Sequence, residues 1–311
     1  MEIMSKKFIE KKAVSLLGAL SRSFKSDRFR SFIKSRIFDR HFNWRRINLE
    51  CKTEFGARIE LRLPDSIQNS ILLTGVWEPL ITRTIQRDLQ KGDVFIDIGA
   101  NIGYYTLLAS RIVGASGKVY AFEASPSIFK RLERNLAINR STNVRIQNIA
   151  ISSHAGTCSI WTAPEGNLGH STIMDKVALS DGHAKEATVS CDSIANLIPP
   201  IDLFKARFIK VDIEGAERMM MEGVKDVLEN FSEDTEWIME LSPEFCPNGT
   251  IDTNFIFNIF TEAGYSCYQI PRPDRVGDIV SDNLIKLESA PTGRLNDVVF
   301  SKNPDRSLEI Y

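Results

Sequence analysis

The chain has 311 residues, of which 43% are hydrophobic and 25% are charged, a composition typical of a soluble globular protein. No apolar run approaches the length of a membrane span, which excludes an integral helical membrane protein. The length is sufficient for one large α/β domain with appendages or for two smaller domains, each with a buried core.

The formal net charge of −1 conceals an uneven distribution. Residues 1–46 contain thirteen Lys or Arg and four Asp or Glu, a net charge of +9, whereas residues 47–311 carry a net charge of −10. A basic arm on an acidic body is typical of contact with an anionic membrane surface or a nucleic acid. It is equally typical of a solvated helical extension that packs on the body.

The five cysteines are scattered, odd in number and without a CxxC pair, so they predict neither a zinc site nor a disulfide framework. Reduced thiols in a reducing compartment are the expectation. The apolar patch at residues 13–20 is too brief for a secretory signal. We therefore expect a cytoplasmic protein, with the basic residues 1–46 as a candidate for peripheral contact with a membrane or another polyanion.

The first part of the chain predicts an extension ahead of the main domain. Apolar residues recur at three- and four-residue intervals over residues 8–43, which indicates a helix, and the alternation over residues 46–63 indicates a β-hairpin. A further helix is expected over residues 75–90. These patterns divide the chain into a helical and hairpin extension, residues 1–74, and a main domain, residues 75–311.

From residue 92 onward, strands and helices alternate. Strands are expected at residues 94–98, 118–122, 144–149, 208–211, 237–241, 265–270 and 298–301, with helices between most of them. This order predicts a doubly wound sheet. Residues 152–206 interrupt it with two short strand candidates around a Gly-rich polar stretch that includes His170. Such an insertion often shapes a substrate site, although a surface hairpin is the plainer alternative.

The most distinctive motif is Asp97-Ile-Gly-Ala-Asn-Ile-Gly103, which follows a strand and opens a helix. Glycines at Gly99 and Gly103 allow a tight turn and a close approach of the backbone to a ligand. The motif departs from the dinucleotide pattern G-x-G-x-x-G, because Asn101 occupies the second glycine position and Thr106, not a glycine, lies three residues after Gly103. This departure weakens the case for NAD or FAD.

Polar side chains follow the next two strands. Glu123 comes directly after the second strand, 26 residues beyond Asp97, where a carboxylate can accept hydrogen bonds from ribose hydroxyls. Asn148 follows the third strand and is a candidate for contact with an adenine edge. A capping or solvent-exposed role is the alternative for Glu123.

A cluster of carboxylates follows the fourth strand in Lys210-Val-Asp-Ile-Glu-Gly-Ala-Glu217. Crowded carboxylates raise one another's pKa and are commonly paired, metal-bound or catalytic. Asp212 and Glu214 are the best candidates for binding the substrate or orienting its nucleophile, and Glu240, after the fifth strand, is expected beside them. Glu217 is better explained as an acid in the first turn of the next helix.

These motifs together resemble the FkbM-type family of S-adenosylmethionine-dependent methyltransferases over roughly residues 75–301. The resemblance is carried by residues 92–106, by Ala121-Phe-Glu-Ala-Ser-Pro126, by Asn148-Ile-Ala150 and by residues 209–217. It implies a Rossmann-like, class I sheet of seven strands whose final strand runs antiparallel. It also implies methyl transfer to an oxygen, usually a hydroxyl of a sugar, polyketide or related metabolite.

The resemblance also assigns roles by position. Asp97, Gly99, Asn101 and Gly103 would form the cofactor loop, Glu123 would hold the ribose, and Glu78, in Val76-Trp-Glu-Pro79, would face the active site. Asp212, Glu214 or Glu240 would activate the acceptor hydroxyl, directly or through a divalent cation, although no metal-ligand motif is present. His170 is a further candidate on the substrate side. The alternatives are a nucleotide-dependent oxidoreductase and a cofactor-binding protein that has lost catalysis.

Overall fold

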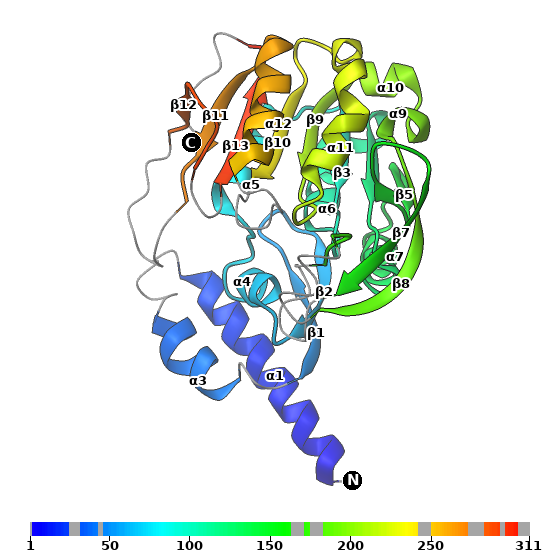
Figure 1. The fold of residues 1–311 in the computed structure, drawn as a ribbon. Helices are drawn as coiled ribbons and strands as arrows, with labels where there is room; N and C mark the ends of the chain where they lie inside the picture. Colours follow the sequence, from blue (N-terminus) through cyan, green and yellow to red (C-terminus); the bar gives the residue numbers. More distant parts are fainter. Residues whose placement is uncertain are drawn as a thin grey trace.

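A computed structural model describes residues 2–24, 32–42, 46–162, 171–174, 183–241, 250–272, 283–292 and 296–303. His170 lies outside the described residues. Two sheets and a hairpin organise the described part of the chain, with helices packed on both faces of the larger sheet (Figure 1).

The larger sheet has eight strands in the order β12-β11-β13-β10-β9-β3-β4-β5. Strands β3, β4, β5, β9 and β10 pair in parallel, whereas β13 runs antiparallel to both β10 and β11. The strands are β3 (Val94–Ile98), β4 (Lys118–Phe122), β5 (Val144–Gln147), β9 (Ala206–Val211), β10 (Glu236–Leu241), β11 (Ser266–Ile270), β12 (Ile285–Leu287) and β13 (Asn296–Ser301). The expected Rossmann-like, class I order with an antiparallel last strand is confirmed, and β12 adds an eighth strand at the edge.

Alternation along each strand directs side chains into two separate apolar cores. Phe95 of β3 packs with the helices α6 (Tyr104–Val113) and α7 (Pro126–Asn139), whereas its neighbours Val94 and Ile96 pack with α11 (Glu217–Val224) and α12 (Thr250–Glu262). Because both faces are covered, every residue of β3 is buried. Figure 1 shows α11 and α12 together on one face. The carboxyl ends of the parallel strands are thereby fixed at one edge.

The predicted hairpin consists of β1 (Ile47–Lys52) and β2 (Arg58–Leu63), and it is held on α7 by two asparagines one helical turn apart. Asn139 Oδ1 accepts from the backbone N–H of Arg58 at 2.9 Å, and Asn135 Oδ1 accepts from that of Glu60 at 2.8 Å. Asn135 also donates to the carbonyl of Ile102, in the loop after β3, at 2.8 Å. The hairpin is therefore tied through α7 to the loop after β3.

Two helix predictions need correction. The helix expected at residues 75–90 is present as α5 (Pro79–Asp88), but it begins later than expected, at Pro79, and an unpredicted helix α4 (Ser66–Thr74), which Gly75 ends at φ 81°, precedes it. The continuous helix expected over residues 8–43 is α1 (Glu2–Ser23), and a π-helical segment (Ile33–Phe38) and a short helix α3 (Asp39–His41) follow later. Residues 25–31 lie outside the description.

The segment 152–206 contributes most of a second, three-stranded sheet. Strand β8 (Ala184–Asp192) pairs antiparallel with β7 (Gly156–Thr162) and parallel with β6 (Ala150–Ile151). The helices α9 (Ile194–Leu197) and α10 (Pro200–Phe204) then lead into β9. Among the described helices, none combines the length and the apolar character needed to cross a bilayer.

Candidate active site

A cavity of about 380 Å³ lies at the carboxyl edge of the large sheet. Its wall combines residues after β3, β4, β5, β9, β10 and β11 with residues from α4, from the start of α5 and from the second sheet. Seven of the predicted site residues line it: Glu78, Gly99, Asn101, Glu123, Asp212, Glu214 and Glu240. The volume lies within the range of about 300–1,000 Å³ that is usual for small-molecule sites.

Backbone strain is concentrated around this cavity. Four described residues other than glycine have a positive φ, and three of them, Glu78, Asn101 and Glu214, line the cavity. Left-handed backbone costs roughly 1–3 kcal/mol at a residue with a side chain, and it is found mainly where the surrounding structure fixes a functional group. The strain therefore marks the cavity as a functional site, independently of any motif.

Gly99 permits the closest backbone contact in the site. Its φ is +82°, and a Cβ placed on it would lie 1.9 Å from the carbonyl oxygen of Asp212. The loops after β3 and β9 thus meet at a distance that no side chain allows. Gly103, at φ +91°, begins α6, and a Cβ there would meet Leu132 of α7 at 2.5 Å. Both glycines are explained by chain packing at the loop.

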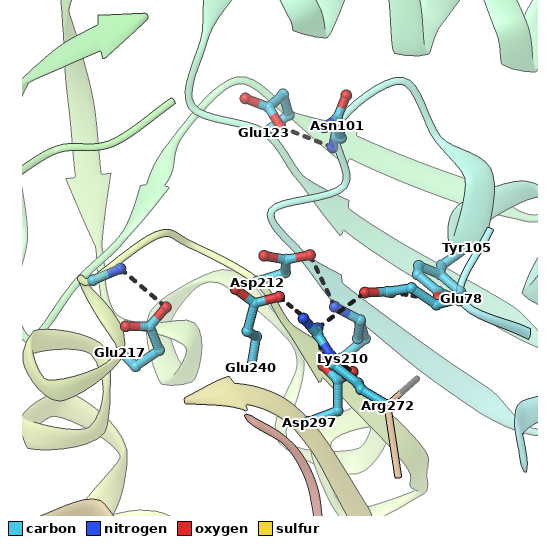
Figure 2. Close-up of polar contacts among 11 residues, drawn as sticks. Glu78, Asn101, Tyr105, Glu123, Lys210, Asp212, Glu217, Glu240, Arg272 and Asp297 are labelled. Atoms are coloured by element: carbon cyan, nitrogen blue, oxygen red, sulfur yellow. Dashed lines mark hydrogen bonds and ion pairs between the residues drawn. The ribbon is translucent and has the colours of Figure 1, made fainter. Parts of the chain in front are cut away.

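Asn101 and Glu123, two of the cofactor-binding candidates, lie together at one end of the cavity (Figure 2). Glu123 Oε2 accepts from the backbone N–H of Asn101, and Oε1 accepts from that of Ser125, both at 2.8 Å. Burial raises the pKa of Glu123 to about 7, although these two bonds act in the opposite direction. The backbone thus fixes the carboxylate at the cavity wall, with lone pairs left for a ligand.

Two further cofactor-binding candidates, Asp97 of the loop and Asn148, expected at an adenine edge, lie outside the cavity wall. Asp97 is buried and accepts from the Thr106 hydroxyl at 2.5 Å, and burial raises its pKa to about 6. Asn148 donates to the backbone carbonyls of Glu123 and Ala124, at 2.8 and 2.9 Å. Both residues hold the loops that carry Asn101 and Glu123. Neither is among the residues that line the cavity.

Lys210 is a fully buried cation beneath the carboxylate cluster. It lies on β9 beside Asp97 of β3, and its Nζ donates to Asp212 Oδ2 at 3.0 Å. Its side chain is 2% exposed and lies 5.3 Å from the ring centre of Tyr105. Burial lowers the pKa of Lys210, but the surrounding carboxylates, led by Asp212, outweigh it and hold the pKa above its usual value. Lys210 therefore stays charged and pairs with Asp212.

Arg272, two residues after β11, joins three carboxylates (Figure 2). Its Nη2 donates to Glu240 at 2.8 Å and to Glu78 at 3.3 Å, and the guanidinium forms a bidentate pair with Asp297. The sheet register explains the need for a cation, since Glu240 of β10 lies directly opposite Asp297 of β13. Like charges in that position repel, and Arg272 compensates both.

Tyr105 extends this network from α6. Its hydroxyl donates to Glu78 Oε2 at 2.7 Å, while Arg272 binds the other oxygen of the same carboxylate. Glu78 lies at the start of α5 in a left-handed conformation, and Pro79 follows it at the first helical position. The helix start and the two partners together fix this carboxylate against the cavity.

The carboxylates of this cluster are harder to ionise than usual. Burial is the main cause for all three. The next cause is repulsion by a neighbouring carboxylate, from Asp297 for Glu78 and from Asp212 for Glu240 and Glu214. The pKa rises to about 8 for Glu78, to about 7 for Glu240 and well above its usual value for Glu214. Lys210 and Arg272 thus lie among five carboxyl groups, the three above with Asp212 and Asp297. A cationic ligand in the cavity would lower the raised pKa values and favour the ionised carboxylates.

Glu217 lies apart from this cluster, as Figure 2 shows. It begins α11 and accepts from the backbone N–H of Gly215 at 3.2 Å. The structural role expected for it in the first turn of a helix is confirmed.

Sequence reasoning missed Tyr105, Lys210, Arg272 and Asp297. Arg272 follows a strand whose carboxyl end lies at the same edge, so the rule used for Glu123 and Glu240 applied to it as well. Asp297 lies at the start of an antiparallel strand, and its amino end reaches that edge. Lys210 gave no signal, because a lysine inside a strand is ordinarily expected to be exposed.

Comparison with known proteins identifies the family. The model of the "Methyltransferase FkbM domain" matches residues 97–267, more than half of the chain. The chain belongs to the FkbM family of S-adenosylmethionine-dependent methyltransferases. The resemblance seen in the sequence is thereby confirmed.

Two curated relatives are similar over part of their length. The chain is 26% identical over 176 residues to the hexuronic acid methyltransferase AglP of Haloferax volcanii, a match that covers 57% of this chain and 67% of that protein. It is 25% identical over 163 residues to the 31-O-demethyl-FK506 methyltransferase FkbM of Streptomyces tacrolimicus, covering 45% and 62%. The match thus spans about two thirds of these relatives.

Among solved structures, a methyltransferase FkbM from Methylobacillus flagellatus KT matches 75% of this chain and 52% of its own, with 13% identity and a TM-score of 0.43.

Proposed function

We propose that this chain transfers the methyl group of S-adenosylmethionine to a hydroxyl oxygen of a small molecule, such as a sugar, polyketide or related metabolite. One observation carries the proposal: Asn101 and Glu123 at one end, and Asp212, Glu214 and Glu240 at the other, line the same cavity. The family match favours methyl transfer over the oxidoreductase that the glycine loop alone allowed.

The chemistry of the cavity suits the cofactor's parts. Glu123 has lone pairs for two ribose hydroxyls, and the apolar residues Phe122, Ile149 and Ala150 offer a surface for adenine. The Asp212–Glu214 turn lies across from the glycine loop, where carboxylates suit the ammonium group of the methionine end. When bound, S-adenosylmethionine supplies a methyl group on a positively charged sulfur.

Glu240 is the proposed general base. A base works best when its pKa lies near the operating pH, and burial places the pKa of Glu240 at about 7. Its oxygen Oε2 is held by Arg272 at 2.8 Å, which fixes the orientation of the carboxylate at the cavity wall. Glu78, with a pKa of about 8, is largely protonated at neutral pH, so it is better suited to bind the acceptor than to deprotonate it.

The acceptor side of the cavity draws on two segments, of which only the first lies outside the matched residues 97–267. Ser66, Ile67 and Ser70 of α4 line it from the proposed extension, residues 1–74, and Ile160 and Ile173 line it from the proposed insertion at about residues 152–206. We propose that these two segments set the acceptor's shape, and that the methyltransferase domain spans residues 75–311. His170, from the same insertion, stays a candidate for substrate binding.

Calorimetry with S-adenosylhomocysteine tests the cofactor assignment. Glu123→Gln keeps the size of the side chain but turns an amide N–H₂ toward one backbone N–H and removes the charge. Loss of charge-assisted hydrogen bonds predicts a weakening of roughly 10- to 100-fold. Glu186→Gln is the matched control, because Glu186 accepts from Ser125 and Ser127 yet does not line the cavity. Equal affinities for the two variants would remove Glu123 from the cofactor site.

Methyl transfer over a panel of hydroxyl acceptors tests the reaction. Glu240→Gln is expected to lower kcat by about 10²–10⁴-fold while cofactor affinity changes little, as removal of a general base predicts. In the unaltered protein, kcat/KM should fall as the pH drops through about 7, the pKa of Glu240, because the base must be deprotonated. Full turnover by Glu240→Gln, or a flat pH profile, would contradict this role.

No described residue of the basic N-terminal segment lines the cavity. A contact between this segment and an anionic surface is a separate proposal, independent of methyl transfer.

A further inference from the structure

The outer face of helix α1 is apolar and uncovered. Ile9, Ala13, Leu16 and Leu20 follow one another at intervals of four, three and four residues, so they lie on one side of the helix. Ile9 is 62% exposed, Leu16 is 72% exposed and Leu20 is 47% exposed. Eight large apolar side chains are exposed in the described part of the chain, and five of them lie between residues 9 and 32. We call the four residues the outer face of α1.

The opposite side of α1 holds the helix on the body. Val14, Gly18 and Ser21 are buried there, and a Cβ on Gly18 would lie 2.7 Å from Leu72 of α4. The Arg22 guanidinium donates to the carbonyl of the same Leu72. The helix α1 thus packs on the rest of the protein through the side that carries Val14, Gly18 and Ser21, and its outer face stays exposed. In Figure 1, the amino end of α1 extends well beyond the body of the molecule.

The charge of this region selects the partner. Residues 1–46 carry a net charge of +9, and Lys11 and Lys12 are exposed within one helical turn of Ile9 and Ala13. A nucleic acid would neutralise the lysines but would leave the aliphatic side chains in water. A second copy of the chain would cover the aliphatic side chains but would bring two strongly basic segments together. An anionic bilayer surface satisfies both, because apolar and basic side chains bind different depths of the same interface.

We propose that the outer face of α1 docks on an anionic lipid membrane. Ile9, Leu16 and Leu20 enter the boundary between headgroups and acyl chains, while Lys12, three residues after Ile9 and four before Leu16, flanks the same side and binds lipid phosphates. Since α1 packs on α4 and α4 forms part of the cavity wall, docking holds that wall near the membrane. The proposal does not depend on methyl transfer, because vesicle binding requires no turnover.

Co-sedimentation of the full chain with vesicles tests the proposal. The chain should bind vesicles of phosphatidylcholine mixed with phosphatidylserine, bind phosphatidylcholine alone much more weakly, and lose binding as salt increases. Leu16→Ser with Leu20→Ser should weaken binding by about tenfold or more, since buried apolar area drives insertion. Lys12→Gln should weaken binding to the mixed vesicles by about fivefold.

A matched control separates specific docking through α1 from nonspecific adsorption of exposed apolar side chains to vesicles. Ile201→Ser with Phe204→Ser removes two side chains that are 58% and 53% exposed on α10, and it should leave vesicle binding unchanged. The melting temperature of the Leu16/Leu20 variant should match that of the unaltered chain, because both side chains face solvent. Equal vesicle binding by this variant and the unaltered chain would overturn the proposal. The proposal would also be overturned if the chain bound an oligonucleotide but no vesicles. It would be overturned as well if the chain bound no vesicles and formed a dimer that the Leu16/Leu20 variant dissociates.

Discussion

The two ends of the cavity, which we propose hold the cofactor and the reacting groups and call the cofactor end and the reaction end, are built in different ways. At the cofactor end, Asn101 and Glu123 are 22 residues apart, and a single backbone hydrogen bond joins them. At the reaction end, Glu78, Glu240 and Asp297 come from three distant segments, and Arg272 holds them together. The first end depends on backbone geometry, and the second depends on the balance of buried charges.

This difference predicts how each end fails. Backbone geometry tolerates no added atom at the closest contact. A buried charge network tolerates small changes of shape, but the loss of one cation leaves several carboxylates uncompensated. A variant can therefore disturb one end while leaving the other intact.

The largest effect is expected from Gly99→Ala at the cofactor end. The new Cβ would lie 1.9 Å from the Asp212 carbonyl oxygen, so the loops after β3 and β9 must separate. We expect a loss of about 5 kcal/mol or more in the free energy of unfolding, beyond the usual range for a single substitution. Denaturant unfolding followed by circular dichroism measures it.

Gly264→Ala is the matched control for this substitution. Gly264 has nearly the same φ, +86°, but a Cβ on it would meet nothing within 4 Å. Only the left-handed strain remains, which costs roughly 1–2 kcal/mol. If the two variants are destabilised equally, backbone strain rather than the contact with Asp212 accounts for Gly99.

The next largest effect is expected from replacement of Arg272, at the reaction end. Arg272→Ala leaves Glu78, Glu240 and Asp297 without their shared partner, and breaking a buried pair in this way costs about 3–5 kcal/mol. Arg272→Lys keeps the charge but loses the bidentate pair with Asp297, so it should recover part of the stability and little of the turnover. Thermal unfolding and single-turnover methyl transfer separate the two quantities.

Arg218→Ala provides the comparison. Arg218 also joins two carboxylates, Asp252 and Glu222, but it lies on α11 and does not line the cavity. The Arg218→Ala variant should be less stable than the unaltered protein, but its turnover should keep the same pH dependence. A similar loss of turnover in Arg218→Ala would mean that Arg272 acts only through the stability of the fold.

The same contrast explains what the sequence could and could not predict. The order of strands, Glu123 and the glycine loop follow from local patterns, because each depends on a strand, a turn and a helix adjacent in sequence. The placement of Asp297 beside Glu240 depends on the register of an antiparallel strand 57 residues later in the chain. Burial of Lys210 depends on Asp212 and on the ring of Tyr105, which come from different elements. No pattern along the chain encodes such a balance of charges.

A smaller effect is expected from pH on the stability of the ligand-free protein. The folded state raises the pKa of Glu78 from its usual 4.5 to about 8, and those of Glu240 and Glu123 to about 7. Between the usual and the raised values, the folded protein keeps protons that the unfolded chain has released. Stability should therefore rise as the pH falls from about 8.5 toward 6, by up to about 1.4 kcal/mol per pH unit for each such proton.

Melting temperatures across this range measure the effect, and the sign is the decisive observation. Carboxylates with lowered pKa would give the opposite slope, with stability lost as the pH falls. The unaltered protein should also lose the slope when it is saturated with S-adenosylmethionine, because the positive sulfur favours the ionised carboxylates. Arg272→Ala should steepen the slope, since it removes the cation that opposes the rise in pKa.

The smallest effect is expected from removal of divalent cations. Two sets of carboxylates, Glu78/Glu240/Asp297 and Asp212/Glu214/Glu240, each place three oxygens within 4.8 Å of one another, a spacing that can hold a metal ion. Arg272 already binds all three carboxylates of the first set, and Lys210 binds Asp212 in the second. A metal ion would have to compete with a cation that the protein supplies, so we expect a chelator to change turnover by less than about twofold. Loss of turnover with a chelator, restored by Mg²⁺ or Mn²⁺, would show instead that the reaction end is completed by a metal ion and that Lys210 and Arg272 only orient its ligands.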